Sequence, residues 1–152
     1  MLYTLMEFVF QDVPLHWVNR LGFVVRKELG RRFEGAGHRV SAEEWAVLLL
    51  LWQSDGQTPG ALAQATIRDR TTVTRLVDGM ANKKLVVRKT DGDDRRRSLV
   101  CLSKKGQALQ DLLVPIAKTL IAECCEGLSA REIKQTVTTL RTMTNNLLAV
   151  AG

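Results

Sequence analysis

Hydrophobic residues recur every three or four positions along most of this chain, which is the spacing that places them on one face of an α-helix. Residues that commonly start helices precede several of these stretches, among them Asp12, the pair Thr58-Pro59 and the capping-box sequence Ser41-Ala42-Glu43-Glu44. The pattern therefore predicts about six helices, over residues 12–33, 42–53, 59–65, 69–83, 103–126 and 130–150. The centre of the second helix is almost wholly apolar, and we expect residues 45–52 to be buried on several sides.

The spacing changes between the fourth and fifth helices, where two short runs rich in β-branched residues flank a polar turn. The runs are Leu85 to Thr90 and Ser98 to Leu102, and Asp91-Gly92-Asp93-Asp94 lies between them, as in a β-hairpin. The third and fourth helices, directly before the hairpin, have helix-turn-helix spacing. We therefore predict a mostly α fold with a small β-hairpin wing, a winged helix-turn-helix, in a single domain over residues 1–152.

Positive charge is concentrated in the region of this hairpin. The chain has a formal net charge of +6, but residues 68–105 hold twelve Lys and Arg against five Asp, a balance of +7. Arg95, Arg96 and Arg97 stand at the expected hairpin tip, where no core can pair with them. The simplest partner for such a wing beside a helix-turn-helix is double-stranded DNA. A basic face that serves only solubility is the alternative.

The fourth predicted helix has two faces of opposite chemistry. One face is an apolar stripe that should point inward, formed by Val73, Leu76, Val77 and Met80. The other carries hydrogen-bonding side chains, as a recognition helix requires, at Thr71, Arg75, Asp78 and Asn82, flanked by Thr72 and Thr74.

Each basic or hydroxyl residue of this region has an expected place on a DNA duplex. Thr71, Thr72, Thr74 and Arg75 would enter the major groove, with Arg75 as the residue that binds guanine. Arg70 would contact phosphate near the helix start, and Arg95 or Arg96 would reach the minor groove. Arg97 lies nearest the strand, so it either contacts DNA with them or only fixes the hairpin.

The terminal helices carry more apolar surface than a small winged-helix core can cover. The last helix has a long apolar stripe, formed by Ile133, Val137, Leu140, Met143 and Leu147. A second copy of the chain would cover this excess. We therefore predict a homodimer that forms through helices at about 12–35 and 104–150, next to a DNA-binding lobe at about 40–103.

Several functional classes find no support in the sequence. It shows no nucleophile–base pair, paired carboxylates or phosphate-binding glycine loop, so we predict neither an enzyme nor a cofactor. His16 and His38 lack the clustered partners of a metal site, and no apolar run approaches the ~20 residues of a membrane span. Met1 to Phe10 lacks the features of a signal peptide and the three cysteines form no disulfide framework, so we expect a cytoplasmic protein.

Five sequence blocks, in order and correctly spaced, resemble the MarR (multiple-antibiotic-resistance regulator) family of winged-helix transcription factors. They are LAQA at 62–65, DRTTVTRLVD at 69–78, KLVVR at 84–88, DGDDRR at 91–96 and LSKKG at 102–106. The chain departs from the family at Gly92, where proline is common, and at Thr66-Ile67-Arg68, which replaces an apolar-Gly-apolar turn. The resemblance implies a homodimer on a palindromic operator, usually a repressor that a small effector or an oxidant releases. It also implies that Asp94 fixes an arginine of the wing by an ion pair.

The family resemblance also suggests where an effector would bind, between the dimer helices and the DNA-binding lobe. His16, Trp17 and Arg20 on the first helix, with Trp45 or Trp52 on the second, would line such a crevice and suit a phenolic or other aromatic molecule. Ordinary core or dimer packing of the tryptophans is the alternative.

Two other functions remain open beside sequence-specific regulation. One is a non-specific or architectural DNA-binding protein, which would use the same charges without sequence readout. The other is a thiol-based redox-sensing regulator. The family's peroxide sensors place a reactive cysteine early in the first helix, where this chain has none, and its cysteines are Cys101, Cys124 and Cys125.

Overall fold

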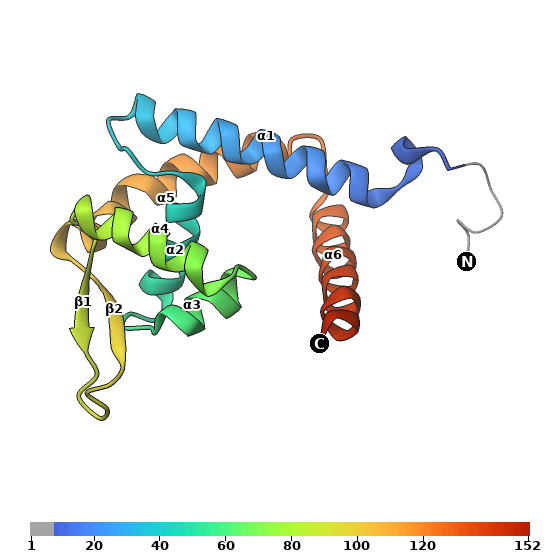
Figure 1. Ribbon diagram of the computed structural model, residues 1–152. Helices are drawn as coiled ribbons and strands as arrows, with labels where there is room; N and C mark the ends of the chain where they lie inside the picture. The colour runs from blue at the N-terminus through green and yellow to red at the C-terminus, as the bar shows by residue number, and fades with distance from the viewer. Residues whose placement is uncertain (1–7) are drawn as a thin grey trace. The chain divides into compact units, whose positions relative to one another are not determined.

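The computed structural model describes residues 8–152, which form six α-helices, one short 3-10 helix and one β-hairpin (Figure 1). In chain order the elements are η1 (Phe10–Asp12), α1 (Pro14–Gly35), α2 (Ala42–Gln53), α3 (Pro59–Thr66), α4 (Arg70–Asn82), β1 (Val86–Thr90), β2 (Ser98–Leu102), α5 (Lys104–Cys124) and α6 (Ala130–Ala151). Most of the segment that lacks signal-peptide features, residues 1–7, lies outside the described residues. The predicted fold class, mostly α with a hairpin wing, is confirmed.

The chain separates into two compact units, Met1–Ile116 and Ala117–Gly152, and helix α5 begins in the first and ends in the second. The first unit contains the helix-turn-helix and the hairpin, together with α1 and α2. Among the described residues, no helix combines the length and the apolar composition that a membrane span needs.

Capping residues set most of the helix starts at the predicted places. Ser41 caps α2 with both bonds of a capping box: the Ser41 hydroxyl accepts from the Glu44 amide at 3.1 Å, and the Ser41 amide donates to the Glu44 carboxylate at 3.0 Å. The prediction that Asp12 caps the first helix is wrong. Asp12 belongs to η1, and the N-cap of α1 is Val13, whose side chain cannot form a capping hydrogen bond. The helix starts there because Pro14 fits its first turn.

Helices α2 and α4 supply much of the core of the first unit. Their fully buried side chains are Val47, Leu48, Leu51, Val73, Val77 and Met80. The predicted inward stripe of α4 is therefore confirmed, with Leu76 half-buried beside it. The prediction for α2 is only partly right, since Leu49 is 43% exposed: a helix in this position packs against neighbours on some of its sides only.

The wing, residues 86–102, is an antiparallel hairpin in which Val86 pairs with Leu102 and Thr90 with Ser98. Figure 1 shows it projecting from the helices of the first unit, with its turn at the far end. A third segment, between α2 and α3, joins the hairpin: Gln57 and Val100 exchange two backbone hydrogen bonds, of 2.8 and 3.1 Å. The Asp55 carboxylate also accepts from the Leu102 amide at 2.8 Å. The hydrophobic pattern gave no sign of this third segment.

The start of α5 is locked against the segment that links α4 to β1. The Ser103 hydroxyl donates to the Lys84 carbonyl at 2.5 Å and accepts from the Gly106 amide at 3.0 Å, so it caps the helix. A Cβ atom at Gly106 would lie 2.1 Å from the Leu85 carbonyl oxygen, so only glycine fits there. The Trp52 indole donates to the Gly106 carbonyl at 3.0 Å and ties α2 to the same point.

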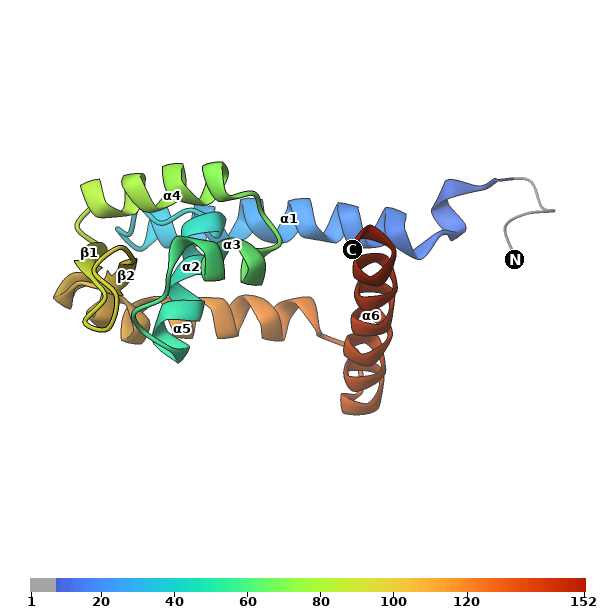
Figure 2. The same cartoon turned by 60° about the horizontal axis from the view of Figure 1, so that its bottom comes forward.

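The second unit contains the end of α5 and the whole of α6, which opens with a capping box at Ser129 and Glu132. Helix α6 contains no buried residue, although it carries the long apolar stripe identified in the sequence. Three of the residues at its C-terminal end are exposed hydrophobic side chains: Leu147, Leu148 and Val150. Viewed from a second direction, α6 is a single continuous helix (Figure 2).

Candidate nucleic-acid interface

The turn between α3 and α4 aims the start of α4 at solvent. Ile67 ends α3 in the left-handed backbone region, at φ 54°, which is an unfavourable conformation for a β-branched residue. Arg68, next to it, lies 3.9 Å from the Glu43 carboxylate of α2. The turn therefore makes a left-handed step at a residue that is not glycine.

Asp69 caps α4 and fixes one of the predicted DNA contacts. Its carboxylate accepts from the Thr72 amide at 2.8 Å and from the Thr72 hydroxyl at 2.6 Å. These two bonds, the hydroxyl bond first, hold the pKa of Asp69 below its ordinary range. Thr72 is half-buried and its hydroxyl proton is engaged, so this residue can offer DNA only its methyl group or an oxygen acceptor.

The face of α4 opposite the core is exposed, as the sequence predicts, at Thr71, Thr74, Arg75, Asp78 and Asn82. The Thr74 hydroxyl donates to the Arg70 carbonyl at 2.8 Å, so its proton is engaged within the helix. Within residues 8–152, the guanidinium groups of Arg70 and Arg75 have no ion-pair partner. Both are therefore available to an external anion or base.

Asp78 has a role that the sequence reasoning missed. Its carboxylate accepts from the Arg88 guanidinium on β1, so an ion pair joins the middle of α4 to the wing. The periodicity placed Asp78 correctly on the outer face but could not identify its partner, which is ten residues away on a different element. The pair links α4 to β1 by one exposed side-chain contact.

The wing tip, residues 91–97, contains three arginines in two different situations. The Arg97 guanidinium lies 3.6 Å from the Asp91 carboxylate, and the Asp91 amide donates to the Arg97 carbonyl at 2.9 Å, so this residue closes the hairpin. Arg95 and Arg96 are exposed, and in the described part of the chain neither forms an ion pair. Of the three arginines predicted to contact DNA, Arg95 and Arg96 thus have no ion-pair partner in the described residues, and Arg97 is paired within the hairpin.

The expectation that Asp94 forms an ion pair with a wing arginine is wrong. The Asp94 carboxylate instead accepts from the backbone amide of Arg96 at 3.0 Å, and the acidic partner of a wing arginine is Asp91. The reason is local: an aspartate in a tight turn reaches the amide two residues ahead more easily than a long side chain on the same turn. Asp94 therefore shapes the turn that presents Arg95 and Arg96.

The predicted effector residues lie in two separate aromatic clusters. On α1, the His16 ring meets the rings of Phe10 and Trp17 edge-to-face, with ring centroids 5.0 and 5.2 Å apart. The Trp17 indole donates to the Gln11 carbonyl at 2.8 Å. On α2, the Trp45 ring lies between the rings of Phe33 and Trp52, with centroid distances of 5.3 and 5.6 Å. Arg20 is exposed. The ring contacts thus join His16 to Trp17 but do not include Trp45 in that cluster.

The three cysteines are unpaired. Cys101 is buried in β2, and this burial raises the pKa of its thiol, with a smaller contribution in the same direction from Asp55. A raised pKa leaves little thiolate, the form that reacts with oxidants. Cys124 is exposed and Cys125 half-buried.

Comparison with known proteins agrees with this geometry. A family model described as the MarR family matches residues 40–98. The transcriptional regulator HosA of Escherichia coli O157:H7 is 29% identical over 102 residues, which cover 67% of this chain and 76% of HosA.

Solved structures show the same fold. BpsR of Bordetella bronchiseptica, whose DNA binding is regulated by 6-hydroxynicotinic acid, superposes with a TM-score of 0.81 at 24% identity, covering 91% of this chain and 98% of BpsR. S. aureus MepR in complex with DNA superposes with a TM-score of 0.79 at 23% identity, covering 91% of this chain and 99% of MepR. Residues 40–98 of this chain thus match the MarR family model, and the chain as a whole has the fold of these solved structures.

Proposed function

We propose that this protein is a homodimeric repressor that binds a palindromic operator in a sequence-specific manner. The observation that carries the proposal is the pair of exposed basic groups without internal partners, Arg75 on α4 and the Arg95–Arg96 pair on the wing. A fold that pairs Arg88 and Arg97 internally and leaves these three unpaired keeps them for another molecule.

Each element has its own part in recognition. Arg75 on the exposed face of α4 has the length and the two-donor geometry that suit guanine in the major groove. Thr71 offers a hydroxyl and a methyl group to neighbouring bases, and Thr74, whose hydroxyl proton is engaged, offers its methyl group. Arg70, at the start of α4, lies where free amides also favour a phosphate. Arg95 and Arg96 suit a narrow minor groove, whose negative potential attracts guanidinium groups.

Uncovered apolar surface supports the dimer. Helix α6 buries none of its residues, and the first half of α1 exposes Leu15, Val18, Leu21 and Val24. Patches of this kind on a lone chain favour association. A two-fold dimer presents two copies of α4, and this symmetry calls for a palindromic site.

Release by a small aromatic molecule completes the proposal. BpsR, a protein of the same fold, is regulated by 6-hydroxynicotinic acid. On this chain, the half-buried His16 and the exposed Trp17 and Arg20 offer rings and one cation on the same stretch of α1. Trp45, which packs between two other rings, would take part only from α2.

Binding to the DNA upstream of the protein's own gene, compared with a scrambled duplex at several salt concentrations, tests the proposal. A sequence-specific regulator keeps a preference of about a thousandfold or more for one site as the salt concentration rises. Footprinting should then show two half-sites about one helical turn apart. Equal affinity for both duplexes at every salt concentration would indicate a non-specific DNA-binding protein instead. Sedimentation of a stable monomer at micromolar concentration would remove the dimer and the palindrome.

A further inference from the structure

Two adjacent glutamates in the first turn of α2, Glu43 and Glu44, reach basic residues at opposite ends of α4. Glu44 pairs with Lys83, the C-cap of α4, and Glu43 pairs with Arg68, which directly precedes the N-cap residue Asp69. Helix α4 has 13 residues and is therefore about 20 Å long, so each glutamate serves one end of it. The two ion pairs differ in what they leave available to another molecule.

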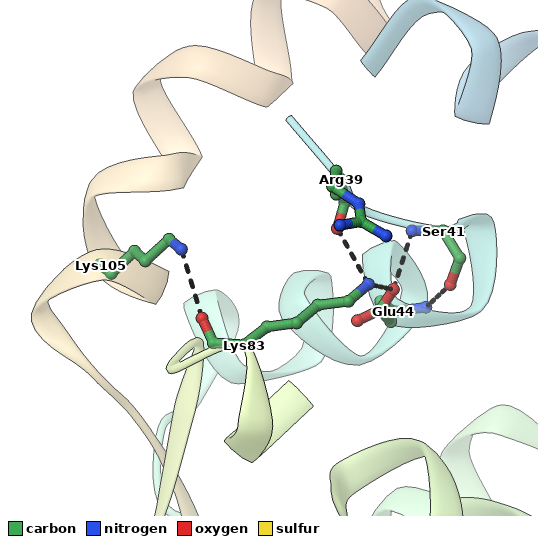
Figure 3. A network of polar contacts seen from close by, with 5 residues as sticks. All are labelled: Arg39, Ser41, Glu44, Lys83 and Lys105. Carbon is green, nitrogen blue, oxygen red and sulfur yellow. Dashed lines mark hydrogen bonds and ion pairs between the residues drawn. The ribbon is translucent and has the colours of Figure 1, made fainter. Parts of the chain in front are cut away.

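The ion pair at the C-terminal end of α4 is buried and hydrogen-bonded. Lys83 donates to the Glu44 carboxylate at 2.7 Å and to the Arg39 carbonyl at 3.0 Å, and the Ser41 amide donates to the same carboxylate oxygen (Figure 3). The Glu44 side chain is only 6% exposed. Without Lys83, Glu44 would be a buried charge that lacks a cation, so this pair stays closed.

The ion pair at the N-terminal end of α4 is open to solvent. The Arg68 guanidinium lies 3.9 Å from the Glu43 carboxylate, too far for a hydrogen bond, and both side chains are 36% exposed. Within residues 8–152, the Arg68 side chain forms no hydrogen bond. Exposed pairs of this kind contribute little to stability, so the guanidinium keeps its donors for another acceptor.

A second guanidinium would keep Glu43 compensated if Arg68 turned away. Arg26 of α1 lies 4.0 Å from the same carboxylate oxygen. Its Nε donates to the Gly22 carbonyl at 3.3 Å and its guanidinium lies 5.1 Å from the centroid of the Phe23 ring, so Arg26 is held on α1. One carboxylate and two guanidinium groups leave this cluster with a net charge of +1, which favours an additional anion.

The backbone of Arg68 is fixed beside the start of α4. Its amide donates to the Ala63 carbonyl at 3.0 Å, and the preceding residue, Ile67, is 63% exposed, so this turn lies on the surface. Arg70, for which we propose a phosphate contact, follows two residues later. The Cα atoms of the two arginines are therefore within about 8 Å of each other. Arg68 stands where the family pattern has an apolar residue.

We propose that Arg68 is a further DNA contact, which exchanges its ion pair with Glu43 for one with a backbone phosphate. Charge-assisted bonds to phosphate oxygens, about 2.7–2.9 Å long, would replace a pair that has no hydrogen bond. Glu43 holds the Arg68 side chain in the free protein and keeps Arg26 as its partner in the complex. The contact carries no base preference, because every base pair presents the same phosphates. This inference rests on the proposed function, in which α4 meets DNA.

Salt titrations of DNA affinity with the full-length protein test the proposal. The two probes are DNA from upstream of the protein's own gene and a scrambled duplex. Arg68→Gln should lower the affinity for both by the same factor, about three- to tenfold, and reduce the salt slope by about one unit. The melting temperature should hardly change. A salt slope equal to that of the wild type overturns the proposal.

Arg26→Gln is the matched control, because it removes the other cation of the same carboxylate. It should leave the salt slope unchanged, whereas Arg68→Lys keeps the charge in the turn and should retain the wild-type slope. Circular dichroism of each variant checks the fold. An equal decrease in slope for Arg26→Gln and Arg68→Gln would mean that the slope reports only the charge of the cluster, and the phosphate contact would be wrong.

The exchange itself is tested at Glu43. Glu43→Gln should raise the affinity for both duplexes by about two- to fivefold, because Arg68 no longer leaves a partner when it meets the phosphate. In the Arg68→Gln background the same substitution should raise the affinity less. Equal gains in the two backgrounds would mean that Glu43 acts only by repelling DNA, and the exchange would be refuted.

The two duplexes keep this inference separate from the proposed function. Equal wild-type affinity for both at every salt concentration removes the sequence-specific regulator, and Arg68→Gln then still tests the phosphate contact on either duplex. A clear preference for the upstream DNA, with a salt slope that Arg68→Gln does not change, removes the contact alone. Absence of any DNA binding removes both.

Discussion

The wing tip and the junction between α2 and α4 both contain basic residues, but the fold uses them in opposite ways. At the junction, Lys83 reaches a carboxylate, that of Glu44, which is 5% exposed and also completes a helix cap. At the wing tip, Arg95 and Arg96 have no partner within residues 8–152. The fold thus pairs the charge of Lys83 internally, whereas the charges of Arg95 and Arg96 stay unpaired in the described part of the chain, as the proposed DNA contact requires.

The difference divides the basic residues into those that are paired within the fold, the folding group, and those that are not. Composition alone cannot separate the two groups, because both lie within the basic segment 68–105. Burial and pairing separate them at once. Within the wing tip itself, Arg97 belongs with the folding group, because it pairs with Asp91, and its two neighbours do not.

The largest effect is expected from removing the unpaired pair. Arg95→Ala with Arg96→Ala should lower operator affinity by about a hundredfold and reduce the salt slope by about one unit for each lost phosphate contact. The melting temperature should hardly change, because exposed charges contribute little to folding. A salt titration by fluorescence anisotropy and a thermal melt measure both quantities. Arg97→Ala is the matched control, with a smaller loss of affinity; a drop in melting temperature for the double variant would place its arginines in the folding group.

Arg75 extends the same comparison from the wing to α4. Arg75→Ala should weaken operator binding by about 1–3 kcal/mol and relax the preference at one base pair of each half-site, because a bidentate guanine contact is lost. Affinity measured on operators with single base changes shows the loss of preference. Equal losses on operator and random DNA would make Arg75 a phosphate contact.

Lys83 should behave in the reverse manner. Lys83→Ala removes the partner of a buried carboxylate whose second oxygen already lacks a hydrogen bond, and should lower the free energy of unfolding by about 1–3 kcal/mol. Glu44→Gln keeps the acceptor for the Ser41 amide, so in the Lys83→Ala background it should recover part of the loss. Denaturant unfolding of the two single variants and the double variant gives the coupling. Additive losses would mean that the pair does not stabilise the fold.

The sequence predicted the elements far better than the contacts between them. The capping box located α2, and two β-prone runs around a polar turn located the wing. Both signals depend on residues only a few positions apart. Three features depend on residues from different elements: the Asp78–Arg88 ion pair, the β-bridge at Gln57 and a cavity that Lys105 lines. No local pattern indicates them. Gly106 is an intermediate case, because its place in a family motif was visible while the carbonyl that excludes a side chain was not.

The errors at Asp12 and Asp94 have the same origin. Both residues were assigned a role from their type and position, and in each case a nearer backbone partner or a proline-led helix start decided the outcome. Short polar side chains bond to the amides that the local backbone offers, so their roles depend on the turn geometry. The effector residues show the corresponding limit for rings, since helical spacing did not reveal that Trp45 packs between Phe33 and Trp52.

The smallest effect is expected at Asp69, which is exposed like the wing arginines but bonded like Lys83. Thr72 bonds hold its pKa below the ordinary value of 3.8, so its stabilising contribution is complete above pH 3.8 and is lost as the pH falls through the lowered pKa. Asp69→Ala should therefore melt at a lower temperature than the wild type at pH 7, and the difference should shrink below pH 3.8. Asp93→Ala removes an exposed aspartate whose carboxylate makes no bond in the described part of the chain, so its melting temperature should match the wild type at each pH. A difference for Asp69→Ala that stays constant with pH would mean that the lost cap acts through its shape and not through its charge.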